Sequence, residues 1–107
     1  AGERSPFQRA STKIGYNYEA IASGRAIRAM EPFIMRPPRT LSKRKLMFAH
    51  AGEELFFVLK GKVELAFDDQ MLTLGPGDSA YFDGSVRHRS RSLGRSLAEV
   101  LIVISHE

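Results

Sequence analysis

The feature that most constrains the fold is a succession of short apolar segments separated by turn signals. Several segments alternate between apolar and polar residues, as in residues 62–67, and glycine, proline and aspartate separate them. A period of two is typical of half-buried strands, and no segment sustains the 3.6-residue period of a helix. The sequence therefore predicts an all-β domain of about eight to ten short strands, closed as a barrel or folded as a double-sheet jelly roll. The expected strands are residues 16–22, 25–35, 46–50, 54–60, 62–67, 71–74, 79–82, 88–92 and 97–105.

The length of 107 residues suits one domain with one core. Residues 1–13 hold almost no apolar side chains and show no period, so a polar tail or linker is expected there. The β-barrel domain is expected to occupy residues 14–107. Within it, residues 36–45 are expected to form a loop, because the two adjacent prolines of this stretch cannot continue a central strand.

The net charge of +4 is concentrated in the first part of the chain, where Lys and Arg dominate residues 1–47. A basic surface could contact nucleic acid, but the sequence contains no helix-turn-helix, zinc finger or interleaved basic and aromatic platform. We therefore expect no direct nucleic-acid binding by this chain. No apolar run could span a bilayer, no secretory signal is recognisable and there is no cysteine, so we expect a cytoplasmic protein without a membrane partner.

Alternation along two strands indicates which side chains face the interior. In residues 87–92 arginine occupies every second position, and three arginines are expected to face water, which points His88 inward. Residues 54–60 are apolar on both faces, so this strand needs a second cover besides the barrel interior. Exposing three large apolar side chains would be costly, so an edge strand from residues 16–22 or 26–35, of the same or a neighbouring chain, is expected to cover this second face, and we predict a homodimer. The residues of this face are Leu55, Phe57 and Leu59.

The stretch HAGEELFFVLKGKVEL, which begins at His50, resembles the first motif of the cupin family. His50, Glu54 and Gly61 have the spacing of the second histidine, the glutamate and the glycine of that motif. Phe48 stands at the position of its first histidine and cannot bind a metal.

The second motif of the cupin family is matched in part. Gly77 and His88 occupy the positions of its first glycine and its histidine. Other residues occupy its proline, second glycine and asparagine positions, namely Asp83, Ser85 and Ser92. The likeness extends over about residues 14–107, and it implies a cupin-type double-stranded β-helix, which is a jelly-roll barrel.

One narrower group of cupin proteins resembles this sequence over a longer stretch. The segments MEPFIM, HAGEELFFVLKGKVEL and LTLGPGDSAYFDGSVRHRSRS, followed by an apolar last strand, resemble the C-terminal cupin domain of bacterial transcriptional regulators with an N-terminal helix-turn-helix. This resemblance implies a sensor domain for a small molecule. It also implies that the polar start of the chain is a linker and that DNA binding would need a helix-turn-helix domain that this sequence does not contain.

Cupin ligand positions identify three candidate metal ligands in this chain. His50, Glu54 and His88 supply two imidazoles and one carboxylate, a set that could hold one divalent transition metal and leave coordination positions open. Zinc, iron, manganese and nickel are all candidates for it. If a metal is bound, metal–nitrogen distances of about 2.0–2.2 Å are expected.

An organic ligand is the alternative occupant of the same interior. The three polar groups would then converge in a ligand-binding pocket with an apolar wall. The wall is expected to include Phe48, Phe56 and either Tyr81 or Phe82, between which strand parity does not decide.

Three functions are consistent with these residues. The leading hypothesis is a ligand-sensing cupin domain of a transcriptional regulator, with or without a metal, in which no residue is catalytic. The second is a stand-alone metal-dependent cupin enzyme, such as a dioxygenase or an isomerase. The third is a structural dimerisation module whose barrel binds nothing.

Overall fold

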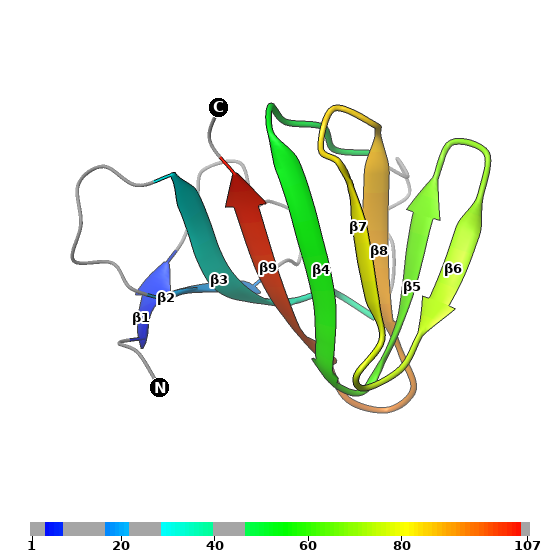
Figure 1. Cartoon of the computed structure of the whole chain (residues 1–107). Coiled ribbons are helices and arrows are strands. Elements are labelled where there is room, and N and C mark those ends of the chain that lie inside the picture. Colours follow the sequence, from blue (N-terminus) through cyan, green and yellow to red (C-terminus); the bar gives the residue numbers. More distant parts are fainter. Residues whose placement is uncertain (1–3, 8–16, 22–28, 40–46, 106–107) are drawn as a thin grey trace.

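The computed structural model describes residues 4–7, 17–21, 29–39 and 47–105 (Figure 1). Within these residues the chain forms nine strands and no helix, so the prediction of an all-β fold is confirmed. No helix in this part of the chain is long and apolar enough to cross a membrane. The strands are β1 (Arg4–Phe7), β2 (Asn17–Ile21), β3 (Met30–Arg36), β4 (Glu53–Lys60), β5 (Lys62–Phe67), β6 (Met71–Leu74), β7 (Ser79–Asp83), β8 (His88–Leu93) and β9 (Glu99–Ser105).

Two antiparallel sheets make up the fold. The larger has the strand order β1-β2-β3-β9-β4-β7 and the smaller has the order β6-β5-β8. Figure 1 shows β3, β9 and β4 side by side, with β8, β5 and β6 forming the other layer. The chain changes sheet between β4 and β5, between β6 and β7, and on both sides of β8. Such repeated crossing is the jelly-roll arrangement predicted from the turn spacing.

Gly61 makes the tight passage from β4 to β5. Its φ of +83° lies in the left-handed region, which glycine adopts at no steric cost. A Cβ at this position would also lie 2.9 Å from the Cα of Ala98. The glycine at this turn is therefore required both by the backbone conformation and by the close approach of Ala98, the residue before β9.

The core lies between the two sheets and is built from alternate residues of facing strands. Burial alternates along β4, β8 and β9, as the period of two predicted, and along β5 as far as Leu65, after which Ala66 is also buried. The buried apolar cluster consists of Phe33, Met35, Phe56, Val58, Val63, Leu65, Ala98, Val100, Ile102 and Ile104. The buried hydroxyl of Ser92 is satisfied locally, because it donates to Pro37 O and accepts from Ala98 N.

Several details differ from the sequence-based expectations. Arg4–Phe7, inside the expected polar tail, is strand β1, because pairing at a sheet edge uses the backbone and needs no apolar side chains. The domain boundary after residue 13 remains a prediction. The strand expected at residues 46–50 is reduced, in its described part, to one bridge between Phe48 and His88. The expected strand positions 16, 22 and 25–28 lie outside the described residues.

The arginine face of β8 is less exposed than expected. Arg89 and Arg91 are half-buried, and Arg91 Nε donates to Glu64 Oε1 at 2.9 Å across the β5–β8 pair. The ion pair lets the long side chain lie along the sheet instead of extending into water. His88 nevertheless faces the interior, as the alternation predicted.

Candidate metal centre

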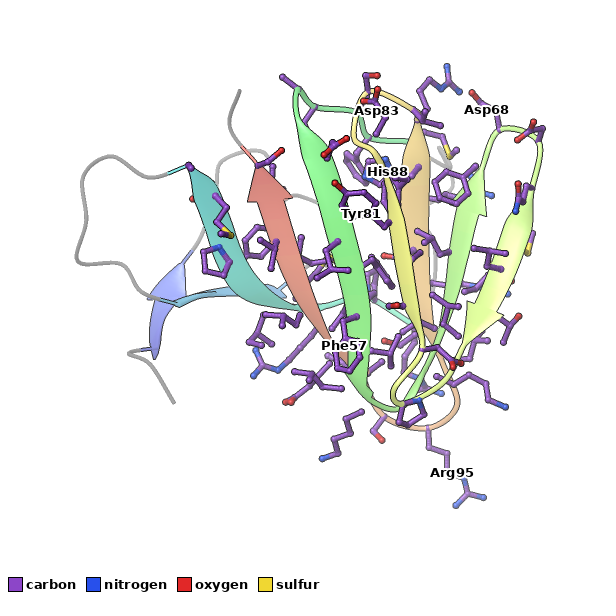
Figure 2. All side chains as sticks on the ribbon, viewed as in Figure 1. Phe57, Asp68, Tyr81, Asp83, His88 and Arg95 are labelled. Atoms are coloured by element: carbon purple, nitrogen blue, oxygen red, sulfur yellow. The ribbon has the colours of Figure 1, made fainter. Side chains whose placement is uncertain are left out.

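Three polar side chains from different parts of the fold meet between the sheets. His50 precedes β4, Glu54 is the second residue of β4, and His88 is the first residue of β8. One ligand atom from each of them lies within 4.8 Å of the others. His88 lies toward the end of the molecule that carries Asp83, opposite the end that carries Arg95 (Figure 2). The structure therefore brings together the three residues that the cupin motif spacing indicated.

Strand register explains why Glu54 and His88 converge. Glu54 pairs with Phe82 on β7 and with Ile104 on β9, so it occupies an interior strand of the larger sheet. Only 5% of its surface is exposed. His88 pairs with Phe67 on β5 and begins the buried row of the smaller sheet. The two side chains thus approach each other from opposite sheets.

His50 lies outside the strands, but hydrogen bonds hold its backbone. Its N–H donates to Gly84 O, in the turn between β7 and β8, at 2.9 Å. Two residues earlier, Phe48 exchanges backbone hydrogen bonds of 2.7 and 2.9 Å with His88. Directly opposed residues of an antiparallel pair project to the same side of the sheet. Phe48 therefore projects toward the site beside His88.

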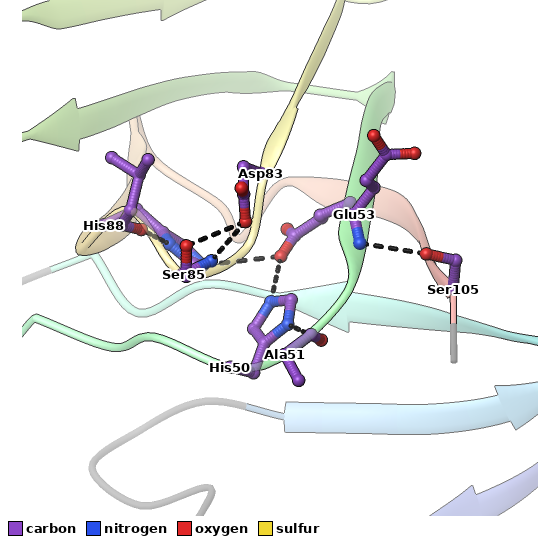
Figure 3. Close-up of polar contacts among 9 residues, drawn as sticks. His50, Ala51, Glu53, Asp83, Ser85, His88 and Ser105 are labelled. Carbon is purple, nitrogen blue, oxygen red and sulfur yellow. Dashed lines mark hydrogen bonds and ion pairs between the residues drawn. The ribbon is translucent and has the colours of Figure 1, made fainter. Parts of the chain in front are cut away.

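Both nitrogens of each imidazole have an oxygen partner. Nδ1 of His50 lies 3.0 Å from Ala51 O, and Nδ1 of His88 lies 2.7 Å from Val86 O. The two Nε2 atoms lie 2.7 and 3.3 Å from the same atom, Oε1 of Glu54 (Figure 3). A carbonyl oxygen only accepts, so each Nδ1 carries a hydrogen. Each Nε2 is then the nitrogen that holds either an additional proton or a metal ion.

Glu54 is the electrostatic centre of this group. Burial acts to raise the pKa of its carboxyl, but the hydrogen bonds and positive charge of His50 and His88 outweigh burial and lower the pKa below its usual 4.5. Glu54 is therefore ionised at neutral pH. A buried carboxylate needs a cation beside it, which can be the histidine protons or a metal ion.

The donor set fits a divalent transition metal. Imidazole nitrogens and a carboxylate oxygen are the ligands that zinc, iron, manganese and nickel share. Histidines that bind metals commonly donate the other ring N–H to a backbone carbonyl, which fixes the ring and its tautomer. His50 and His88 both make that contact. The side chain at position 48 is apolar, so within the described part of the chain His50, Glu54 and His88 are the group that could hold a metal ion at this place.

Aromatic side chains surround His88. The ring of Phe82 meets it edge-to-face at a centroid distance of 4.9 Å, and the ring of Phe67 lies at 6.4 Å. Phe67 and Phe82 also contact each other at 5.1 Å. Sequence analysis did not include Phe67 in the site. Its position on the interior face of β5 followed from parity, but its place opposite His88 depends on the β5–β8 register.

Two of the expected wall residues lie elsewhere. Tyr81 does not line the interior, since it is 68% exposed and its hydroxyl donates to Glu53 on the outer side of the sheet. Phe82 takes the interior position because neighbouring strand residues face opposite ways. Phe56 does face inward, but it is 1% exposed and belongs to the packed core. The apolar wall of the site is therefore formed by Phe67 and Phe82, with Phe48 projecting beside them.

Comparison with protein families identifies one match. A family model described as Cupin_2, a cupin domain, matches residues 37–104 of the chain. No protein with a curated description is similar to the sequence.

Solved structures share the fold at low sequence identity. The Cupin_2 domain of an XRE family transcriptional regulator from Enterobacter cloacae has a TM-score of 0.73 and 18% identity, over 88% of this chain and 99% of that chain. An HTH_3 family transcriptional regulator from Vibrio cholerae has a TM-score of 0.69 and 18% identity, over 87% of this chain and 52% of that chain. HppE in its Fe(II) form with the alternative substrate (S)-1-HPP has a TM-score of 0.69 and 20% identity, over 97% and 56% of the two chains. At these identities the likeness shows the fold alone.

Proposed function

Since the chain belongs to the cupin family, we propose that it is the ligand-sensing domain of a transcriptional regulator and that its site holds one divalent metal. His50, Glu54 and His88 would be the protein ligands. In this proposal the domain is not catalytic. The metal would supply coordination positions, open to a small molecule, that the three side chains do not fill.

One observation carries the metal assignment. Two imidazoles, each with Nδ1 bound to a backbone carbonyl, direct their Nε2 atoms at one buried carboxylate oxygen. In this arrangement the Nε2 lone pairs would face a negative charge unless a proton or a metal ion lies between each ring and Glu54. A metal ion satisfies all three groups together, so the arrangement favours metal binding.

The surroundings indicate the kind of small molecule. Phe67, Phe82 and Phe48 offer apolar contacts beside His88, and the open positions of the metal would take an oxygen or nitrogen donor. We therefore propose a small organic ligand with a polar, metal-binding group and an apolar part.

The regulator assignment is supported by the extent of the fold likeness. The Enterobacter cloacae domain is covered almost completely, and about half of the Vibrio cholerae regulator is covered. In this proposal, DNA contact belongs to a separate helix-turn-helix domain and not to the barrel. A DNA-bound regulator works in the cytoplasm, so the proposal includes that location.

A homodimer is part of the same proposal. The outer face of the larger sheet, which is the side turned away from the smaller sheet, is apolar along its central rows. It includes Leu55, Phe57, Leu101 and Val103, which are half-buried, and Leu59, which is 42% exposed. A second copy over this face would remove apolar surface from water, and two-fold regulators read two-fold DNA sites.

A metal-dependent enzyme is the second candidate function. Two histidines and one carboxylate with open positions also suit oxygen chemistry at iron, and HppE in its Fe(II) form shares the fold. A dioxygenase or isomerase would turn over its substrate in the metal-loaded protein. Oxygen uptake that depends on both the metal and an added substrate would favour this candidate over the sensor.

Metal stoichiometry tests the shared basis of both candidates. Metal-free protein is titrated with Zn²⁺, Mn²⁺, Ni²⁺ and, without oxygen, Fe²⁺, and bound metal is measured after gel filtration. We expect about one ion per chain in the wild type and in Glu53→Gln, whose carboxylate lies on the outer face. Glu54→Gln should bind far less. Equal binding by all three proteins would place the metal elsewhere, and no binding by any would remove the metal from the proposal and leave an organic ligand as the occupant to test.

A further inference from the structure

Gly84, in the turn between β7 and β8, packs directly against the ring of His50. A Cβ at this position would lie 2.1 Å from Cε1 and 2.4 Å from Nδ1 of His50. Real Cβ atoms do not approach other heavy atoms so closely, because van der Waals contact between carbons begins at about 3.5 Å. Alanine at position 84 therefore cannot coexist with the present position of the imidazole.

Backbone conformation does not explain the glycine. Gly52, Gly61, Gly77 and Gly94 have positive φ values, but Gly84 does not. An ordinary residue could adopt the backbone geometry at position 84. The need for glycine at this position is thus a need for space, chiefly beside the His50 ring and also beside Gly52 O, from which a Cβ would lie 2.8 Å.

The backbone around this contact cannot simply move apart. His50 N donates to Gly84 O at 2.9 Å, and Gly84 N donates to Gly52 O at 2.8 Å. The turn that carries Gly84 is also braced, since Asp83 Oδ1 accepts hydrogen bonds of 2.9 and 2.8 Å from the N–H and hydroxyl of Ser85. These contacts hold the two segments at a fixed spacing, and the imidazole is the group that would have to shift.

We propose that Gly84 is a positioning residue for the candidate metal centre. Its missing side chain leaves the space in which the His50 ring places Nε2 2.7 Å from Glu54 Oε1 and Nδ1 3.0 Å from Ala51 O. The inference rests on the proposed metal site for its function, but the placement of the ring can be tested without metal.

Gly84→Ala tests the proposal, with Gly75→Ala as the matched control. A Cβ on Gly75 meets only Asp78 Oδ2 at 3.8 Å, which is an ordinary contact, and Gly75 has no positive φ. In metal-free protein, nitrogen-15 NMR of the histidine rings should show a changed shift or tautomer for His50 in Gly84→Ala, with smaller changes at His88. The Gly75→Ala spectrum should match the wild type.

Metal binding gives the second measurement. Competition with a chelator should show that Gly84→Ala binds Zn²⁺ at least about tenfold more weakly than the wild type, because losing a group that orients a metal ligand typically costs that much affinity. The Zn²⁺ affinity of Gly75→Ala should be unchanged. Wild-type affinity together with unchanged His50 ring signals in Gly84→Ala would overturn the proposal. If the wild type itself binds no metal, the proposed function fails, while the ring signals still decide whether Gly84 positions His50.

A double-mutant cycle covers the case in which Gly84→Ala is unstable. The ring contacts are the shortest ones a Cβ would make, so removing the ring should relieve most of the clash. The drop in melting temperature caused by Gly84→Ala should therefore be clearly smaller in a His50→Ala background than in the wild type. An equal drop in both backgrounds would show that the backbone contact with Gly52 O, and not the imidazole, requires glycine.

Discussion

Replacing Phe48 with histidine should add a fourth protein ligand to the candidate centre. Phe48 lies directly opposite His88 and exchanges two backbone hydrogen bonds with it, so the two side chains project to the same side. Cβ atoms of such pairs are about 5 Å apart, which is within reach for two imidazoles on one metal ion. Phe48→His would also restore the histidine that the cupin motif places there.

The size of the effect can be estimated in two parts. Without metal, replacing a half-buried phenylalanine should cost about 1 kcal/mol, which is roughly half the value for a fully buried side chain. With metal, an added ligand should tighten Zn²⁺ binding by at least about tenfold, because even groups that only hydrogen-bond to metal ligands change metal affinity by that factor. In excess metal, each tenfold gain adds about 1.4 kcal/mol to the free energy of unfolding.

Chelator competition and urea unfolding with and without Zn²⁺ would measure both parts. Phe48→Leu is the control, because it removes the ring without adding a donor. We expect Phe48→His to be less stable than the wild type without metal and to gain more from metal than either the wild type or Phe48→Leu. Equal Zn²⁺ affinity for the histidine and leucine variants would refute the reasoning, because position 48 would then not face the metal.

Four further predictions concern the pH dependence of stability, the pH dependence of metal affinity, assembly and the core. The pKa of Glu54 is lowered in the folded protein, so the contribution of its carboxylate to stability is complete above pH 4.5 and is lost as the pH falls below that value. Urea midpoints of metal-free protein should fall over this pH range, and the fall should be smaller in Glu54→Gln. Zn²⁺ affinity should also fall with falling pH, because protons compete for the two Nε2 atoms. Light scattering should report the mass of two chains for the wild type and of one chain for Phe57→Arg, whereas a monomeric wild type would remove the dimer from the proposal. Leu65→Ala should lower the free energy of unfolding by about 2–5 kcal/mol, because the side chain is fully buried between the sheets. A loss below about 1 kcal/mol would show that the core around position 65 closes over the space left by the leucine side chain.

The sequence was sufficient to predict the fold class and the three converging polar residues. Alternation with arginine placed His88 inward, and the spacing of His50 and Glu54 before an apolar strand matched a known motif. These signals are local, or depend only on parity along one strand, and such patterns can be read without knowing how strands pair.

The parts that the sequence did not predict depend on pairing between distant segments. Tyr81 and Phe82 are both aromatic, so parity offered two equal choices until the register of β7 against β4 was known. Phe67 enters the site only because β5 pairs with β8. Gly84 resembled an ordinary turn glycine, since its contact with His50 joins segments whose approach no local pattern records.

The placement of the candidate ligands on two different sheets has a consequence for folding kinetics. Glu54 belongs to β4 of the larger sheet and His88 to β8 of the smaller, and β3 near the start pairs with β9 at the end of the described chain. Pairings between segments so far apart in the chain are slow to form, because long loops must close first. We predict that a metal ion held by both strands has no complete site in the folding transition state. The metal would leave the folding rate nearly unchanged and would lower the unfolding rate. The unfolding rate, and not the folding rate, would therefore report whether the metal is bound.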